Sequence, residues 1–268
     1  VKAVEMASLT STGDVGVSSS GGGSVQGDKG DSVAVGALIV VNTANASALA
    51  TVEQSADVTA TGGRVTVQAD NIASLDAQLD AAISSAGDSV GVLIAFNTLG
   101  YEAENILFQT VDALIGTDIG DKSFSDAEAW IIDSDVAGQA GVTVTATNSA
   151  ELTARIGTDV SSDPSAFQGA EAMAAQGVLA SNMLAGAANA FIDDTDATPS
   201  GESVTSAAGM VRVAASDEVV LESQTLIDTG ASRTNDLGLG LLNNLAQELL
   251  DTYQYTTESG SPALVFGD

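Results

Sequence analysis

The chain has 268 residues, of which 44% are hydrophobic and 4% aromatic, and it contains neither cysteine nor histidine. Its 7 basic and 36 acidic residues give a net charge of −29, which argues against nucleic acid or an anionic membrane as an electrostatic partner. Without Cys and His there are no disulfides, no thiolate or imidazole metal ligands and no Ser-His-Asp arrangement, so any chemistry would rest on carboxylates.

The first predicted element is a turn followed by an alternating strand, and it recurs along the chain. The four copies are "LTSTGDVGVSSS" (9–20), "VTATGGRVTVQAD" (58–70), "VAGQAGVTVTATN" (136–148) and "VTSAAGMVRVAAS" (204–216). In the second copy Val65 and Val67 point to one side of a strand while Thr66 and Gln68 point to the other. This recurrence predicts a repeat protein.

Two further elements precede these turns in the same order. An apolar run occurs at 33–43, 90–100 and 176–186, and a more acidic strand follows at 46–58, 127–136 and 188–197. The repeats are therefore placed at 33–89, 90–175 and 176–235, with a partial copy at 1–32. Asn42, Asn97 and Asn182 fall at corresponding places, which predicts a ladder of hydrogen-bonded Asn side chains at a corner of the fold.

Insertions lengthen some repeats. Residues 101–126 carry apolar side chains at helical spacing, which predicts a short helix near 103–116, and a leucine face predicts a second helix at 239–252. A β-hairpin is expected after it, so 236–268 is set apart from the repeats. Propensity favours a helix for the Ala-rich stretch from 170 to 192, but its alignment with 90–100 favours a strand.

These patterns predict an all-β parallel β-helix, or β-solenoid, over 1–235. Repeats of this length suit three stacked coils of about 19 residues each. A β-sandwich is the competing all-β fold. No apolar run reaches the roughly 18 residues of a membrane span, so no membrane insertion is expected. We interpret the chain as a piece of a longer polypeptide.

The order of the blocks resembles a known family. "GVLIAFNTLGYEAENILFQTVDALIG", "AEAWIIDSDVAGQAGVTVTATNSAELTA", "GVLASNMLAGAANAFIDDTDA" and "LNNLAQELLDTYQYTTESGSPALVFGD" resemble the repeats of giant bacterial surface proteins, the filamentous-haemagglutinin-like large adhesins. The resemblance covers nearly all of the chain. It implies a right-handed β-helix, secretion to the bacterial cell surface or extracellular space, and a role in attachment, filaments or surface layers. It supplies no catalytic residues.

Clustered aspartates are the only candidate metal ligands. The candidates are Asp193, Asp194 and Asp196 in "FIDDTDA", Asp118, Asp121 and Asp126 in "GTDIGDKSFSD", and Asp133 and Asp135 in "IIDSD". Calcium takes about six to eight oxygen ligands, which close-set Asp residues and backbone carbonyls can supply. Neither the EF-hand spacing nor the glycine-rich nonapeptide of calcium-binding β-helices is present, so solvated corners are the alternative interpretation.

The function expected from the sequence is structural and non-enzymatic: an adhesin stalk, an extracellular filament or a matrix subunit. Its expected partners are copies of itself, stacked end to end, and surface glycans or other cells. Divalent cations are expected to bridge the acidic filaments. The alternative is a glycan-binding or glycan-cleaving β-helix that uses paired carboxylates, although such enzymes need a basic or aromatic groove. An ice-binding Thr face is disfavoured because Thr143 and Thr145 have no aligned counterparts in every copy.

Overall fold

The computed structural model describes residues 1–20, 32–54, 56–101, 123–163, 165–166, 173–195, 201–232, 234–235, 255–256 and 262–263. Strands dominate these residues, and none of them lies in a helix. The helices expected at 103–116 and 239–252 fall outside the described residues. Within the described part of the chain, no helix is long and apolar enough to cross a bilayer.

Four parallel sheets hold the repeats together, and each repeat adds one strand to each sheet. The long sheet has the order β1-β5-β9-β14, and the second sheet has the order β11-β6-β2. Two sheets of shorter strands have the orders β12-β7-β3 and β13-β8-β4. The all-β, parallel architecture expected from the sequence is therefore present.

The strand bounds are as follows. In the long sheet they are β1 (Lys2–Ser19), β5 (Val65–Ser85), β9 (Val142–Ser162) and β14 (Val211–Ala231). In the second sheet they are β2 (Val33–Ala44), β6 (Asp88–Leu99) and β11 (Met173–Leu184). The short strands are β3 (Ala48–Val52), β7 (Ala127–Ile132), β12 (Ala188–Asp193), β4 (Asp57–Ala60), β8 (Asp135–Gly138) and β13 (Val204–Ser206). Two small pairs complete the set: β10 (Ser165–Ala166) with β15 (Thr234–Asn235), and β16 (Tyr255–Thr256) with β17 (Pro262–Ala263).

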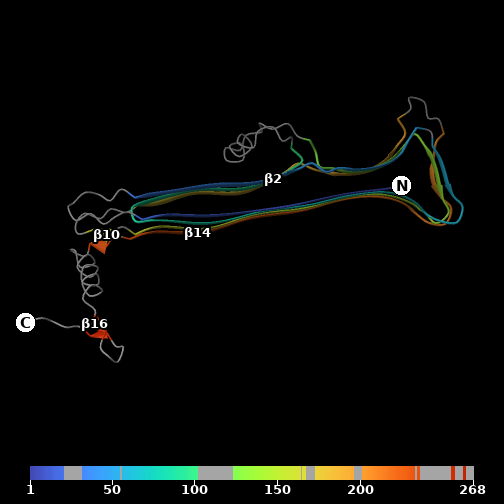
Figure 1. Cartoon of the computed structure of the whole chain (residues 1–268). Coiled ribbons are helices and arrows are strands. Elements are labelled where there is room, and N and C mark those ends of the chain that lie inside the picture. The colour runs from blue at the N-terminus through green and yellow to red at the C-terminus, as the bar shows by residue number, and fades with distance from the viewer. Residues whose placement is uncertain are drawn as a thin grey trace, which may run out of the picture.

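The two sheets of long strands run side by side as extended layers, and the short strands close one end of the cross-section (Figure 1). The chain passes once round this flattened outline in each repeat, because Val65, Val142 and Val211 pair in neighbouring strands. The expected division of each repeat into three short coils is therefore wrong. One repeat is one large coil, built on strands of up to 21 residues.

The strand register tests the alignment of the repeats. Val58 pairs with Val136, which pairs with Val204, as the aligned turns predicted. The Ala-rich stretch forms β11 and β12, so its assignment as strand is confirmed. The N-terminal copy was misaligned, since Leu9 pairs with Leu75 and residues 9–19 form the second half of a long strand.

Alternation along the long strands builds a core of small side chains. In β5 the residues from Val65 to Ser85 at odd positions are buried, while those between them are exposed or half-buried. Leu79, Leu93 and Ile156 pack in one cluster that spans both long sheets. The narrow gap between the layers explains why Ala, Val and Leu replace aromatics, because larger rings would force the sheets apart.

Leu152 provides a test of this core. Its side chain is fully buried, and it packs in one cluster with Leu75. Leu152→Ala is expected to lower the free energy of unfolding by about 2–5 kcal/mol, through lost transfer energy and the cavity left behind. Leu226→Ala is the matched control because Leu226 is 72% exposed. Urea unfolding followed by circular dichroism measures both, and equal effects would contradict the core assignment.

Candidate functional site

An asparagine ladder runs through the interior between the two long sheets. Asn42, Asn97 and Asn182 occupy the same register position in β2, β6 and β11. Asn42 Nδ2 donates to Asn97 Oδ1 at 2.9 Å, and Asn97 Nδ2 donates to Asn182 Oδ1 at 2.8 Å. The predicted ladder is confirmed, but it lies within the strands and not at a corner.

The same amides also tie the second sheet to the long sheet. Asn42, Asn97 and Asn182 each donate from Nδ2 to a backbone oxygen of the facing strand, at 2.8, 2.7 and 2.7 Å respectively. The three acceptors belong to Asp76, Thr153 and Glu222, which are neighbours in register on β5, β9 and β14. Asn42 and Asn97, which are buried, therefore use both amide hydrogens, one along the stack and one across it, whereas the half-buried Asn182 at the end of the ladder donates to Glu222 O and to Ser223 Oγ.

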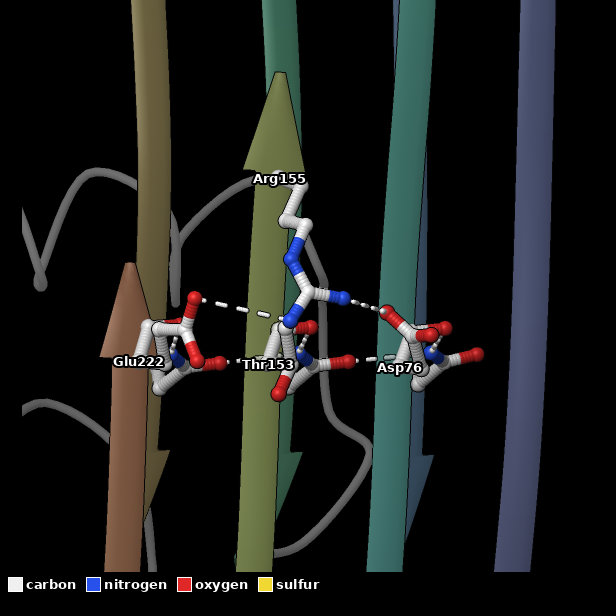
Figure 2. A network of polar contacts seen from close by, with 7 residues as sticks. Asp76, Thr153, Arg155 and Glu222 are labelled. Atoms are coloured by element: carbon white, nitrogen blue, oxygen red, sulfur yellow. Dashed lines mark hydrogen bonds and ion pairs between the residues drawn. The ribbon is translucent and has the colours of Figure 1, made fainter. Parts of the chain in front are cut away.

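On the outer face at the same level, Arg155 bridges three strands. Its guanidinium lies between the carboxylates of Asp76 and Glu222 (Figure 2), at 3.8 Å from Asp76 Oδ1 and 3.4 Å from Glu222 Oε1. All three side chains are about a third to a half exposed, so the contacts contribute little to stability. Their effect is to relieve repulsion between acids on a strongly acidic surface.

A second amide ladder crosses the long sheet, and the sequence analysis missed it. Asn71 Nδ2 donates to Asn148 Oδ1 at 2.9 Å, and Asn148 Nδ2 donates to Asp217 Oδ1 at 3.0 Å. Glu5 holds the corresponding position in β1. The aligned copies "VTVQADN" and "VTVTATN" already placed Asn71 opposite Asn148, so this signal was present in the sequence.

Aspartates at the corners join one repeat to the next. Asp126 Oδ1 accepts from the backbone amide of Ala187 at 2.8 Å, and Asp135 Oδ1 accepts from that of Ser203 at 2.8 Å. Asp133, which has a left-handed φ of 46°, accepts from the Thr195 amide at 2.6 Å and from its hydroxyl at 2.5 Å. These carboxylates supply partners for backbone N–H groups at turns, where the strand ladder is interrupted.

One corner gathers carboxylates from three segments. Oxygens of Asp133, Asp194 and Glu202 lie within 4.8 Å of one another. Asp194 and Glu202 border a surface hollow of about 470 Å³, whose apolar lining includes Ile131 and Ile192. Three carboxylate oxygens are fewer than the roughly six to eight that calcium takes, so further ligands would have to come from backbone or water.

The expected calcium ligands are only partly described. Asp194 belongs to this acidic corner, and Asp193 lines the same hollow, where its Oδ1 accepts from the Asp194 amide at 3.0 Å. Asp118, Asp121 and Asp196 lie outside the described residues. Calcium binding at these positions stays a prediction. Asp133, a candidate expected from "IIDSD", lies at the same corner, whereas Glu202 comes from a segment that the sequence did not single out.

The hydrogen bonds from Thr195 affect the ionisation of Asp133. The Thr195 hydroxyl and then its backbone amide hold the pKa of the Asp133 carboxyl below its ordinary value of 3.8, against a smaller opposing effect of desolvation. Donors that face a carboxylate favour its charged form. Asp133 therefore stays ionised under mildly acidic conditions, which suits its role as a turn acceptor.

Comparison of the chain with protein-family models, with curated protein sequences and with solved structures finds no match.

The interior ladder predicts the effect of removing one amide. Asn97→Ala would leave the Thr153 carbonyl and the amides of Asn42 and Asn182 without their central partner in a buried setting. We expect a loss of about 1–3 kcal/mol in the free energy of unfolding, the cost of unsatisfied buried polar groups. Asn45→Ala, at an exposed turn position, is the control. Denaturant titration decides, and equal stability of the two variants would contradict the ladder's role.

The corner predicts a pH dependence for Asp133. Because its folded pKa is lowered, the Asp133–Thr195 contact stabilises the fold fully above the ordinary pKa of 3.8 and is lost as the pH falls through the lowered folded value. Thr195→Val removes the hydroxyl donor, so the Asp133 pKa should rise towards its ordinary value. Carboxyl-carbon NMR titration measures it, with Thr61→Val at another exposed turn as the control. An unchanged Asp133 titration would refute the assigned cause.

Proposed function

We infer that the chain is a structural, non-enzymatic segment of a secreted bacterial surface protein, serving as an adhesin stalk, an extracellular filament or a matrix subunit. The observation that carries this proposal is the register. All four sheets stack strands in parallel, with equivalent residues side by side through successive repeats. We propose that these parallel sheets form a right-handed parallel β-helix. This architecture lengthens by adding repeats without changing its cross-section.

The charge and the interior support a mechanical role. The excess of 36 acidic over 7 basic residues keeps rods of this kind apart and soluble. The interior is held by amide ladders that repeat along the stack, so the load on one rung is shared with its neighbours. The resemblance of the repeat blocks to giant surface proteins points to the same class.

A glycan-binding or glycan-cleaving β-helix is the second candidate, and one observation favours it. Trp130 and Phe191 stack with ring centroids 5.3 Å apart on β7 and β12, close in sequence to Asp133 and Asp194 of the acidic corner. Aromatic faces and paired carboxylates are the groups that sugar hydrolysis uses. If this candidate is correct, the protein binds glycans or releases sugar from them, and this activity depends on Glu202. A passive stalk shows no such activity.

Antibodies raised against the purified chain test the proposed location and role. In the source organism we expect labelling of intact, unpermeabilised cells along fibres or a surface layer, because the segment is proposed to lie outside the envelope. In-frame deletion of this segment from its gene should shorten or remove those structures. Immunogold electron microscopy measures both.

An antibody to a cytoplasmic protein is the control for cell integrity. Labelling that appears only after permeabilisation, or fibres that the deletion leaves unaltered, would contradict the proposal.

A further inference from the structure

The two ends of the stack are matched to each other. One end presents the outer edges of β1, β2, β3 and β4, and the other presents those of β14, β11, β12 and β13. Among the described residues, no strand pairs with any of these outer edges. Strand lengths agree closely, with 12 residues in both β2 and β11 and 18 and 21 residues in β1 and β14. All strands stack in parallel, so one end of a copy fits the opposite end of another.

Continuing the register across such a junction defines its contacts. Leu9 pairs with Leu75, which pairs with Leu152, which pairs with Leu221. One more step of the same register sets Leu221 of one copy beside Leu9 of the next. Leu75 and Leu152 are buried, whereas Leu9 is 38% and Leu221 51% exposed. The end residues therefore occupy core positions that lack only a neighbouring coil.

The second sheet has the same property. Neither β2, "VAVGALIVVNTA", nor β11, "MAAQGVLASNML", contains a charged residue. Exposed edge strands are usually protected from pairing by charges, prolines or bulges, and these two lack the charges and prolines. The register also places Asn42 of a second copy beside Asn182, where it would extend the amide ladder by one rung.

One inward-facing pair opposes this fit. In the interior repeats the second amide ladder uses Asn71 and Asn148, but the ends carry Glu5 and Asp217 at the same register position. The continued register brings Glu5 of one copy next to Asp217 of another, at the strand spacing of about 4.8 Å. Two like charges at this distance repel, and their inward position limits screening by solvent. The acids thus stand where Asn would favour stacking.

We propose that copies of this chain stack head to tail, with β14 and β11 of one copy pairing in parallel with β1 and β2 of the next, and that the Glu5–Asp217 pair limits this association. The occupant of each end is a second copy, because the two ends match in strand order, direction, length and side-chain position. This inference rests on the proposed structural function and adds to it the interface and the residues that control it.

Substitution of the acid pair is the first test. The double variant Glu5→Asn, Asp217→Asn restores the interior ladder residue at both ends. We expect it to form linear oligomers at a concentration at least about tenfold lower than the unaltered chain, since removing a close like-charge pair changes association by more than this factor. Sedimentation velocity on the purified 268-residue chain measures it. Unchanged association would overturn the proposed role of the pair.

Two leucine variants, each made in the background of the double variant, test whether the inward face of β14 forms the junction. Leu221→Lys places a charge at the junction and should abolish oligomers. Leu226 pairs with the outward-facing position of Gly157, so Leu226→Lys on the same strand should leave them unchanged. Circular dichroism confirms that both variants fold. Equal loss in both, or in neither, would overturn the assigned interface.

Disulfide trapping tests the polarity, because the chain has no cysteine of its own. Leu9→Cys and Leu221→Cys are made separately in the double-variant background, mixed and oxidised. Head-to-tail stacking yields a disulfide between the two variants, while pairing of like ends yields disulfides within one variant and would overturn the proposal. Trapping with no labelling of intact cells would reject the surface function alone, and surface labelling without trapping would reject the stacking alone.

Discussion

In-register parallel pairing is the constraint on which the rest of this structure depends. Every inward position in one repeat lies beside the equivalent position in the next, so a buried side chain must be compatible with a copy of itself or a close substitute. Asparagine meets this condition because its amide carries both donors and an acceptor. Asn42, Asn97 and Asn182 satisfy one another along the stack and still bond the facing sheet. Asn42 and Asn97 therefore fix the register while the nitrogen and the oxygen of both side-chain amides are paired.

The same constraint limits where negative charge is tolerated. On the outer face, Asp70 pairs with Val4 and Thr147, and Asp76 pairs with Thr10 and Thr153, so these acids have neutral neighbours on both sides. Where acids do align, as Asp159 does with Asp228, both side chains are exposed and water screens them. The inward positions have no such screening. A net charge of −29 is thus compatible with stacked strands because most of it faces solvent.

Sequence reasoning succeeded where side-chain period and alignment agreed. Val65 and Val142 marked the long strands, and the aligned runs placed the first Asn ladder in register. It failed on the size of the coil because the second half of β5, "LDAQLDAAISS", lacks the valines that make alternation visible. The alignment of residues 9–20 with the other turn copies was wrong, and packing at Gly13 explains why this strand looks different. Gly13 stands where Leu79 stands in the next repeat, and the space is filled instead by Leu38 and Val40 from the facing strand.

The aspartates at the corners are explained by the hydrogen-bonding needs of the backbone. The acidic stretch "IIDSD" was expected to be either a cation site or a solvated turn, yet Asp133 and Asp135 accept hydrogen bonds from amides of the following repeat. Asp126 does the same at the previous corner. Strand ladders stop at the corners, so backbone N–H groups there need side-chain acceptors, and a short carboxylate with two oxygens meets that need. Acidic corners thus follow from stacking large coils, and the corner aspartates join the repeats where the sheets cannot.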